Sequence, residues 1–345
     1  MLSALPVPRT PDPGVAPPMR WGILGTGLIA GRMVEALHMH TRQQVVAVGS
    51  RNLSRAEQFA ATWGVPNAYG SYEQLVSRKD VDIIYVATPH SEHFIHTMLA
   101  LRAGKPALVE KAFTRNWKEA NQLVTTARAA HLPVMEAIMT RHTPALDIVR
   151  QIVDDGELGA TDTLIADHGQ NLVNIPRLVK PELAGGALLD LGIYCIQLAV
   201  FLGGLPRRVS ATGALTDTGV DAHVAMACDG FPRLPRMLAS LHTTMLAWTP
   251  TTAVISGSSA RVELSCPFTS GGVALRYVPQ EGDVLQTPMP QITGSQALCY
   301  EAAHFAQLVA DGVPDSPIMP MDESVSIMGL LDEIRSQIGL RYPGE

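Results

Sequence analysis

The 345-residue chain has no excess of positive charge: 26 lysine and arginine residues against 32 aspartate and glutamate residues give a formal net charge of −6. Nucleic acids and anionic membranes are bound by clustered basic residues, so the sequence disfavours both as partners. A hydrophobic content of 46% with 17% charged residues is typical of a folded globular protein. The length is sufficient for two domains.

Cysteine is scarce and unpaired in the sequence. Cys195, Cys228, Cys266 and Cys299 are far apart, and none belongs to a C-x-x-C pair of the kind that builds zinc and redox sites. We therefore expect buried thiols in a reducing compartment, and hence a cytoplasmic protein.

The chain also lacks an apolar run that approaches the length of a membrane-spanning helix. Residues 1–18 have neither a basic start nor a continuous apolar stretch, and they are rich in proline. This composition predicts a disordered tail, not a signal sequence. Met19 stands directly before the first predicted strand and is an alternative start.

Residues 19–144 alternate between short apolar runs and segments of helical period. This alternation predicts a Rossmann dinucleotide-binding domain with a doubly wound parallel sheet. Capping-box spacing at Ser54 and Glu57 and at Ser71 and Gln74 marks two helix starts, and Ser91 marks a third. The predicted strands are Trp21–Leu24, Val45–Gly49, Ile83–Thr88, Ala107–Val109 and Pro133–Ala137.

Residues 145–345 change in character. After a helix at Ala145–Val153, alternating stretches predict a large, mostly antiparallel open sheet in a second α/β domain for substrate binding and dimerisation. The helical segments Gln296–Ala310 and Asp322–Ile338 either stay with this sheet or pack on the first domain. The predicted strands include Thr161–His168, Arg208–Ala214, Ala222–Cys228, Met237–Thr244 and Ala253–Ile255.

Closely spaced glycines follow the first predicted strand, in the order Gly25-x-Gly27-x-x-Ala30. Gly25 permits a turn with positive φ, Gly27 lets the backbone approach a pyrophosphate, and the small Ala30 lets the helix close on the strand. The free N–H groups of the helix start face the phosphates. The pattern predicts dinucleotide binding; the alternative is an ordinary strand-to-helix turn.

The end of the second predicted strand reads Gly49-Ser50-Arg51-Asn52. NAD enzymes usually place Asp or Glu there to hold the ribose hydroxyls. Here no carboxylate repels a 2′-phosphate, and Ser50 and Arg51 can bind one, so the sequence favours NADP over NAD. The alternative for Arg51 is a solvated loop arginine.

Three polar residues form a candidate catalytic set. Lys111 follows Glu110 at the carboxyl end of a predicted parallel strand, where doubly wound folds bind ligands. Asp190 and Tyr194 are four residues apart and share a helix face. An adjacent ammonium favours a phenolate, which gives Tyr194 the role of proton acceptor in carbinol oxidation, with Asp190 orienting the substrate or Lys111. The alternatives are a surface lysine, an aspartate that favours the helix dipole and a tyrosine packed in the core.

His90, His93 and His96 are spaced three residues apart, which resembles a metal-binding pattern. Helical residues six apart point about 120° from one another, so the three rings cannot converge on one ion from a regular helix. We therefore expect no metal. His90 and His93 are candidates to line the nicotinamide pocket.

With these motifs in place, the chain resembles the Gfo/Idh/MocA oxidoreductase family from Met19 to Tyr342. The motifs are the glycine turn, Thr88-Pro89-His90-x-x-His93, Glu110-Lys111, and Gly185-Gly186 leading to Asp190 and Tyr194. The similarity is greatest to the dimeric dihydrodiol dehydrogenase branch, which includes NADP-dependent D-xylose dehydrogenases. Further matching phrases are Ala68–Glu73, Met135–Ala137 with Thr140-Arg141, Leu188–Cys195 and Thr218–Asp221.

The resemblance implies a Rossmann domain followed by a domain whose open sheet forms a homodimer or higher homo-oligomer. It assigns catalysis to Lys111 and Tyr194, with Asp190 assisting. The family usually has proline after the lysine, and Ala112 in its place leads us to expect no cis bond there and a less rigid Lys111. We expect the cofactor to be bound by Gly25, Thr26, Gly27, Leu28, Ile29, Ser50, Arg51, Thr88, Pro89, His93, Glu110, Lys111 and Arg141.

The sequence thus predicts an NADP-dependent dehydrogenase that transfers hydride between the nicotinamide and a CH–OH group of a small polyhydroxylated ring, either an aldose such as D-xylose or a trans-dihydrodiol. Two alternatives stay open: a non-catalytic NADP-sensing regulator, and a sugar–sugar oxidoreductase with tightly bound NADP. We expect specificity to be set by loops near Asn171–Lys180 and Cys266–Gly272.

Overall fold

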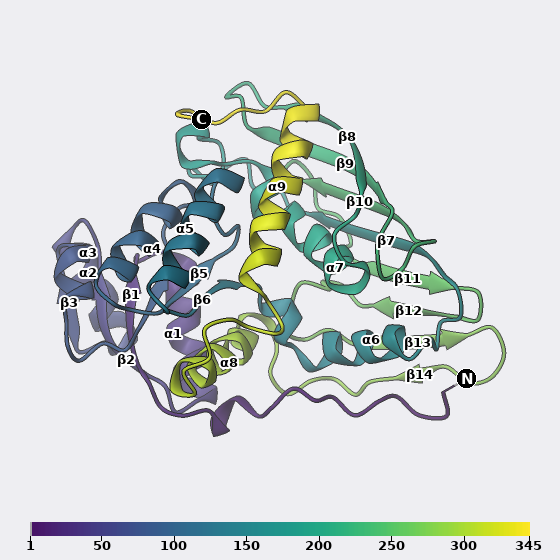
Figure 1. The fold of residues 1–345 in the computed structure, drawn as a ribbon, viewed down its shortest axis with the longest axis horizontal. Coiled ribbons are helices and arrows are strands. Elements are labelled where there is room, and N and C mark those ends of the chain that lie inside the picture. The colour runs from purple at the N-terminus through teal and green to yellow at the C-terminus, as the bar shows by residue number, and fades with distance from the viewer. Residues whose placement is uncertain (1) are drawn as a thin grey trace. The chain divides into compact units, whose positions relative to one another are not determined.

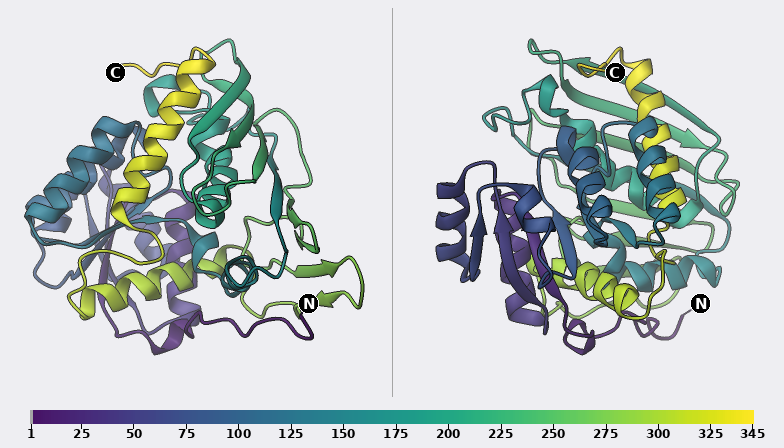
Figure 2. Two further views of the ribbon diagram at one scale, coloured as in Figure 1. Left: turned by 45° about the vertical axis from the view of Figure 1, so that its right-hand side comes forward. Right: turned by 60° about the vertical axis from the view of Figure 1, so that its left-hand side comes forward.

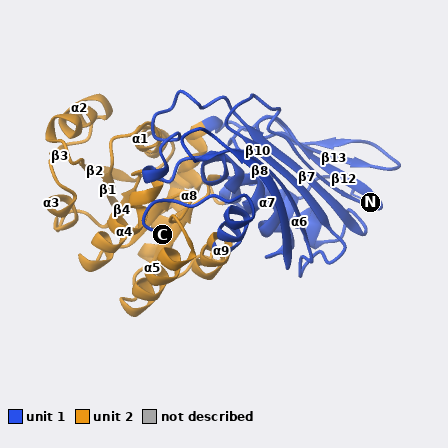
Figure 3. Ribbon diagram, turned by 90° about the horizontal axis from the view of Figure 1, so that it is seen from above, with its two compact units in different colours: residues 1–10, 140–294, 329–345 blue, residues 11–139, 295–328 orange. Residues whose placement is uncertain are grey.

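The computed structural model describes residues 2–345, which form two compact units (Figures 1 and 3). Unit 1 comprises residues 2–10, 140–294 and 329–345. Unit 2 comprises Pro11–Met139 and Ser295–Met328. Each unit is built around its own sheet.

Unit 2 contains the strands β1 (Arg20–Leu24), β2 (Gln44–Gly49), β3 (Asn67–Tyr69), β4 (Ile83–Val86), β5 (Ala107–Glu110) and β6 (Val134–Ala137). They pair in parallel in the order β3-β2-β1-β4-β5-β6, which is the order of a doubly wound Rossmann sheet. All five predicted strands are present, and the predicted α/β fold class is confirmed. The sequence does not predict β3, which has only three residues.

The helices of unit 2 are α1 (Leu28–His40), α2 (Leu53–Trp63), α3 (Tyr72–Val76), α4 (His93–Arg102), α5 (Trp117–Ala129), α8 (Leu298–Ala310) and the first half of α9 (Met321–Gln337). Figure 3 shows α1 and α2 on one side of the strands and α4 and α5 on the other. The central strands are buried on both faces because helices cover both. Helix α8 joins this core through Phe305, whose ring centroid lies 6.4 Å from that of Trp21.

The start of α2 differs from the prediction. Its cap is Asn52, whose side-chain oxygen accepts from the backbone N of Arg55 at 3.2 Å. The predicted capping box of Ser54 and Glu57 is therefore wrong, because asparagine two residues earlier already satisfies the first turn.

The other two predicted caps have opposite outcomes. Ser71 caps α3 and accepts from the N of Gln74 at 3.2 Å, which confirms that prediction. Ser91 caps nothing, because it lies inside a short 3-10 turn, His90–Glu92, that begins directly after Pro89. Helix α4 starts only after this turn.

Unit 1 contains the strands β7 (Thr161–Gly169), β8 (Arg208–Leu215), β9 (Asp221–Asp229), β10 (Leu238–Thr244), β11 (Ala253–Gly257), β12 (Ala260–Leu264), β13 (Leu275–Pro279) and β14 (Leu285–Gln286). They form one sheet in the order β14-β13-β12-β11-β7-β10-β9-β8, which Figure 2 shows from two sides. Only β7 and β10 pair in parallel, so the predicted mostly antiparallel sheet is confirmed.

One face of this sheet is covered by helices. Unit 1 contributes α6 (Pro144–Asp154) and α7 (Ile193–Gly203), and α7 packs against β7 and β10. The opposite face carries Ile165, which is 56% exposed, and the exposed Leu238 on the adjacent strand. Apolar side chains thus lie on the face that no helix of this unit covers.

We expected no apolar run that approaches the length of a membrane-spanning helix. The segment Pro181–Gly203, which ends with α7, is such a run, so this expectation is wrong. By length and composition alone the segment is able to cross a membrane, with a mean hydropathy of 1.8 over its most apolar 18 residues. Inside the protein, 89% of that window is buried. Such burial is typical of a core helix, because a helix that is apolar all round needs cover on every side.

The proline-rich start, expected to be disordered, forms extended chain with one 3-10 turn at Pro13–Val15. Arg9 pairs with Asp147 of α6 at 2.6 Å. All four cysteines are free thiols; Cys266 is exposed and the other three are buried. The expectation of buried thiols is therefore wrong for Cys266, which lies in the loop after β12.

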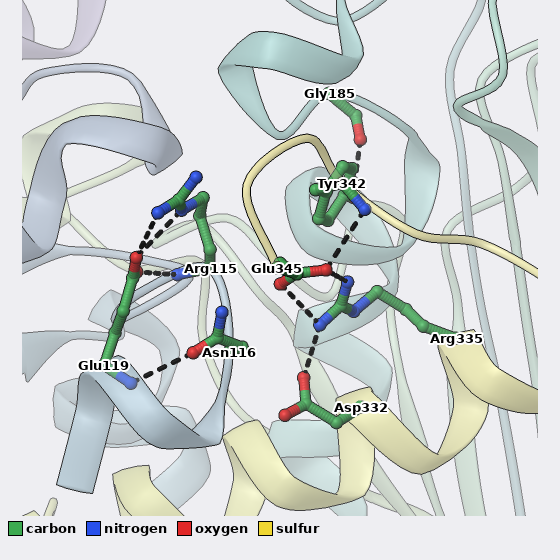
Figure 4. A network of polar contacts seen from close by, with 8 residues as sticks. All are labelled: Arg115, Asn116, Glu119, Gly185, Asp332, Arg335, Tyr342 and Glu345. Atoms are coloured by element: carbon green, nitrogen blue, oxygen red, sulfur yellow. Dashed lines mark hydrogen bonds and ion pairs between the residues drawn. The ribbon is translucent and has the colours of Figure 1, made fainter.

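The start of α5 is held by a local network (Figure 4). The Asn116 side chain accepts from the N of Glu119 at 3.0 Å, and the Glu119 carboxylate accepts from the N and Nε of Arg115 at 3.1 and 2.9 Å. These bonds satisfy amides that a helix start leaves unpaired.

We expect Asn116→Ala to lower the free energy of unfolding by about 1 kcal/mol, the usual effect of losing an N-cap. Urea unfolding followed by circular dichroism measures it. Asn121→Ala, an exposed change inside the same helix, is the control and should not destabilise, since alanine favours helix interiors. Equal effects at the two positions would contradict the capping role.

Candidate active site

The glycine turn joins β1 to α1 in unit 2. Gly25 has a φ of +111°, and a Cβ there would lie 2.6 Å from the carbonyl oxygen of Ala87, so only glycine fits. Its N donates to the carbonyl of Gly49 at 3.0 Å, which ties the turn to the end of β2. The turn therefore lies at the carboxyl edge of the sheet, where strand order reverses.

The start of α1 is open. Gly27 is its N-cap residue, contributes no side-chain cap, and has no atom within 4 Å of the position that a Cβ would take. The neighbouring Leu28 is 78% exposed, and Thr26 and Ile29 are partly exposed. An uncapped helix start with free space in front of it fits a pyrophosphate, because its N–H groups and the helix dipole favour an anion.

At the end of β2, Ser50 is buried and Arg51 is exposed. Ser50 Oγ accepts from the N of Asn52 at 3.2 Å, so this hydroxyl is held in place. Burial is the largest effect on the pKa of His96 and lowers it, and the positive charge of Arg51 lowers the pKa of both His96 and Tyr72. Burial outweighs it at Tyr72, whose pKa is raised overall.

The loop Thr88-Pro89 after β4 is held by histidines of α4. Both ring nitrogens of the fully buried His93 lie 2.8 Å from backbone carbonyls, Nε2 from Thr88 and Nδ1 from Ala112. His96 Nδ1 lies 3.0 Å from Thr88 Oγ1. Burial is the largest effect on His93 and lowers its pKa to about 4, so the ring is neutral at pH 7 and donates to one carbonyl at a time.

The backbone that follows Lys111 is fixed from two sides. His93 contacts the carbonyl of Ala112, and the N of Phe113 donates to Glu136 Oε1 at 2.9 Å. The bond between Lys111 and Ala112 is cis, so the expectation of no cis bond there is wrong. The less rigid placement of Lys111 stays a prediction.

Three buried glutamates lie behind this segment. Glu110 accepts from the hydroxyl of Tyr85, and Glu136 accepts from Ser324 at 3.2 Å. Glu301 of α8 is fully buried, and within residues 2–345 neither of its oxygens has a hydrogen-bond partner. Burial, then the charges of Glu110 and Glu136, raise the pKa of Glu301 well above its ordinary value.

In unit 1, Asp190 lies in a π-helical turn, η5 (Leu188–Gly192), that leads directly into α7. Tyr194 lies in the first turn of α7. Residues four apart stay on one face in π- and α-helical geometry, so the predicted juxtaposition is present. Asp190 is buried and Tyr194 is half-buried.

Asp190 has a partner that the sequence did not assign. Arg177, in the loop after β7, donates to Asp190 Oδ1 at 2.9 Å, with side-chain exposures of 45% and 8% respectively. The pair fixes the carboxylate from the solvent side. Arg177 lies within the loop expected to set specificity.

The Tyr194 ring packs edge-on against His168, with centroids 5.3 Å apart. His168 Nδ1 lies 3.2 Å from the carbonyl of Leu191, and its Nε2 lies 3.0 Å from Nε2 of Gln170. The first contact needs a proton on Nδ1 and the second needs a lone pair on Nε2, so the two define a neutral ring. Arg141 is buried in the same unit, donates to the carbonyl of Gln197 at 3.2 Å and stacks on Phe201.

The candidate residues thus divide between the units. Unit 2 contains Gly25 to Ile29, Ser50, Arg51, Thr88, Pro89, His93, Glu110 and Lys111; unit 1 contains Arg141, Asp190 and Tyr194. In unit 2, Gly25, Ser50, Thr88 and Lys111 all lie at the carboxyl ends of parallel strands.

A parallel sheet of this order with an open glycine turn at its switch point defines a dinucleotide-binding protein of Rossmann type. A model for an oxidoreductase family with an NAD-binding Rossmann fold, GFO/IDH/MocA, matches residues 19–138, and the model for the C-terminal domain of the same family matches residues 147–263. The chain belongs to the GFO/IDH/MocA oxidoreductase family, and the family prediction is confirmed. It is an oxidoreductase of the NAD(P)-binding class.

Relatives match the chain over nearly its whole length. It is 37% identical over 332 residues to a trans-1,2-dihydrobenzene-1,2-diol dehydrogenase of Macaca fuscata fuscata, and 36% identical over 339 residues to the human enzyme of that name. Each match covers 94% of this chain and 98% of the relative.

Solved structures are also similar. A 3-ketoreductase from Actinomadura kijaniata in complex with NADP and TDP-benzene has a TM-score of 0.82 at 27% identity, covering 93% of this chain and 98% of its own. An aldose–aldose oxidoreductase from Caulobacter crescentus has a TM-score of 0.82 at 25% identity, covering 93% and 97%.

Sequence reasoning missed Arg177, His168 and Glu301. Two of these residues had a sequence signal that could have marked them as site residues. Arg177 lies in the loop expected to set specificity, and His168 ends a predicted strand. Glu301 had none, because a single acidic residue in a helical segment is ordinarily exposed.

The depressed pKa of His93 makes stability depend on pH. In the unfolded chain the His93 ring is protonated below about pH 6.5, whereas in the folded protein it is protonated only below about pH 4. The free energy of unfolding therefore falls as pH drops through this range, by about 3 kcal/mol for this group. We expect His93→Gln to lose less stability than the wild type between about pH 7 and pH 4.5, measured by urea unfolding.

The matched control for this measurement is His38→Gln, since His38 is exposed at the end of α1. This variant should follow the wild-type pH dependence. A wild-type dependence that persists in His93→Gln would show that His93 is not the titrating group.

Proposed function

We propose that this protein is an NADP-dependent dehydrogenase that transfers hydride between the nicotinamide and a carbinol of a small polyhydroxylated ring, an aldose such as D-xylose or a trans-dihydrodiol. The observation that carries the proposal is the fixed backbone at Lys111. It holds a cationic side chain at the carboxyl edge of the Rossmann sheet, on the same edge as the open glycine turn.

The substrate class is supported by the relatives. Sequence identity of 36 to 37% along nearly the full chain links it to enzymes named for a cyclic trans-diol. A structural neighbour is named for aldoses. Both substrates present a ring carbon that bears a hydroxyl group and has a hydroxyl-bearing neighbour, which is the group that the proposed reaction oxidises.

The choice of NADP rests on Ser50 and Arg51. No carboxylate occurs in the sequence Gly49-Ser50-Arg51-Asn52 to repel a 2′-phosphate. The Ser50 hydroxyl is held by Asn52, and the exposed guanidinium of Arg51 is available for charge-assisted bonds to phosphate. The solved 3-ketoreductase of similar fold binds NADP.

The proposed division of labour follows from this chain's own groups. The α1 start and Gly27 bind the pyrophosphate, and Ser50 and Arg51 bind the 2′-phosphate. The bound nicotinamide supplies the hydride acceptor or donor. Lys111 orients the substrate hydroxyl, Tyr194 Oη takes its proton, and Asp190, held by Arg177, positions the substrate.

A second candidate is a sugar–sugar oxidoreductase that retains its nucleotide. The aldose–aldose oxidoreductase of similar fold favours it. Stoichiometric nucleotide in extensively dialysed protein would support this alternative, and nucleotide-free protein would exclude it.

Homodimer formation is a further part of the proposal. The face of the second sheet that carries Ile165 and Leu238 is the surface on which we place the contact between two copies. Exposed apolar side chains on adjacent strands support it, because uncovered apolar patches mark protein contacts.

The catalytic roles are tested by Tyr194→Phe and Lys111→Met. We expect each to lower kcat by roughly 10²- to 10⁴-fold, the range of general acid–base contributions, with NADPH affinity unchanged. Turnover is followed by nicotinamide absorbance and affinity by NADPH fluorescence.

Tyr300→Phe and the exposed Lys118→Met serve as matched controls and should keep full turnover. Full activity in both Tyr194→Phe and Lys111→Met would contradict the proposed roles of the two residues. Loss of NADPH binding along with activity would assign these residues to the cofactor instead.

The cofactor preference is tested by Arg51→Ala. We expect the KM for NADP to rise about 10- to 100-fold, since a hydrogen bond to a charged group contributes about 1.5 to 3 kcal/mol. The KM for NAD, which lacks the phosphate, should change little. Arg55→Ala, exposed in the first turn of α2, is the control. Equal changes for NADP and NAD would contradict the assignment.

A further inference from the structure

The helical segment that carries Asp190 and Tyr194 begins without a cap of its own. Ala187 stands at the cap position and contributes no side-chain hydrogen bond. The first amides of a helix have no partner inside it, so they need an acceptor from elsewhere. This segment is buried, and water is not an easy substitute.

Asp221 supplies that acceptor from a distant part of the chain. It is the first residue of β9, it is fully buried, and its Oδ2 accepts from the N of Leu188 at 2.6 Å. A carboxylate at a helix start also interacts favourably with the helix dipole. One buried side chain of the sheet thus completes the first turn of the segment.

The turn before this helix packs closely against Asp221 and against the backbone near Leu178. Gly186 has a φ of +111°, and a Cβ there would lie 1.9 Å from Asp221 Oδ1. A Cβ on Gly185 would lie 2.4 Å from the carbonyl oxygen of Leu178. Gly186 is therefore required by close packing against the carboxylate, and Gly185 by close packing against the backbone of residues 177–178.

The same turn is held from a third side by the C-terminal segment. Tyr342 Oη donates to the carbonyl of Gly185 at 2.7 Å, and Figure 4 shows the ring pointing toward that oxygen. Tyr342 is itself fixed by Arg335, which stacks on its ring at 4.8 Å and pairs with Asp332 and Glu345.

Burial disfavours the ionised form of the Asp221 carboxylate. It raises the pKa of Asp221 to about 6, against the opposing effects of the Leu188 and Ala187 amides and the Arg335 charge. Burial, then the charge of Asp221, raises the pKa of Tyr342 well above its ordinary value. At neutral pH the Asp221 carboxylate is therefore ionised despite a penalty, which the bond to the Leu188 amide offsets in part.

We propose that Asp221 is a positioning residue that fixes the start of the Asp190–Tyr194 helix through the Leu188 amide and thereby places both side chains for the reaction. The inference rests on the proposed roles of Asp190 and Tyr194, which follow Leu188 within two helical turns. In this proposal Asp221 acts through the backbone N of Leu188 and is not itself a catalytic residue.

The experiment compares Asp221→Ala and Asp221→Asn with Asp229→Ala. Asp229 ends the same strand and pairs with the exposed Arg208 at 2.8 Å, which makes it a matched control. We expect Asp221→Ala to lower kcat roughly 10- to 100-fold, the scale of a small misplacement of catalytic groups. NADPH affinity should not change, because the glycine turn belongs to unit 2.

Asp221→Asn keeps one acceptor oxygen and should recover part of the lost kcat. Gly186→Ala, which leaves Asp221 present but displaces it, should reproduce the loss. Circular dichroism at neutral pH checks that each variant is folded, and we expect Asp221→Asn to be no less stable than the wild type because it removes a buried charge.

Hydrogen–deuterium exchange of residues 187–194 provides a readout that needs no substrate. We expect exchange there to be at least about tenfold faster in Asp221→Ala and unchanged in Asp229→Ala. Unchanged exchange, or unchanged kcat in a folded Asp221→Ala protein, would overturn the proposal. If the wild type turns over no substrate at all, the proposed function fails, while the exchange data still decide whether Asp221 holds this helix.

Discussion

Buried side chains that bond to the backbone of another element hold both candidate catalytic segments in place. In unit 2, His93 and Glu136 bind the carbonyl of Ala112 and the N of Phe113, directly after Lys111. In unit 1, Asp221 binds the start of the segment that carries Asp190 and Tyr194. In both units a candidate catalytic side chain extends from backbone that buried side chains of other elements hold, which is the preorganisation that the proposed catalysis needs.

This arrangement places polar groups where burial is costly. Burial is the largest single effect on the pKa of His93, which it lowers, and on the pKa values of Glu301 and Asp221, which it raises. Such groups persist when they satisfy backbone amides or carbonyls that would otherwise be orphaned. Glu301, which lacks a hydrogen-bond partner among residues 2–345, does not fit this explanation, and we have no physical account of it.

The sequence predicts what depends on local chemistry. The five Rossmann strands follow from apolar runs, and the turn at Gly25 follows from a conformation that glycine alone tolerates. Hydrogen bonds between residues far apart in the sequence are not predicted. Arg177 and Asp190 are 13 residues apart, and Leu188 and Asp221 are 33 residues apart. No periodicity or spacing encodes these bonds. The contacts to the backbone after Lys111 likewise come from distant elements, His93 of α4 and Glu136 of β6.

The most direct test of the proposed reaction is absorbance of the reduced nicotinamide at about 340 nm. Purified protein is mixed with NADP or NAD and with a panel of aldoses, inositols and cyclic trans-diols. We expect turnover with at least one ring substrate and a preference for NADP. No absorbance change across the panel, from protein that demonstrably binds NADPH, would contradict the proposed dehydrogenase.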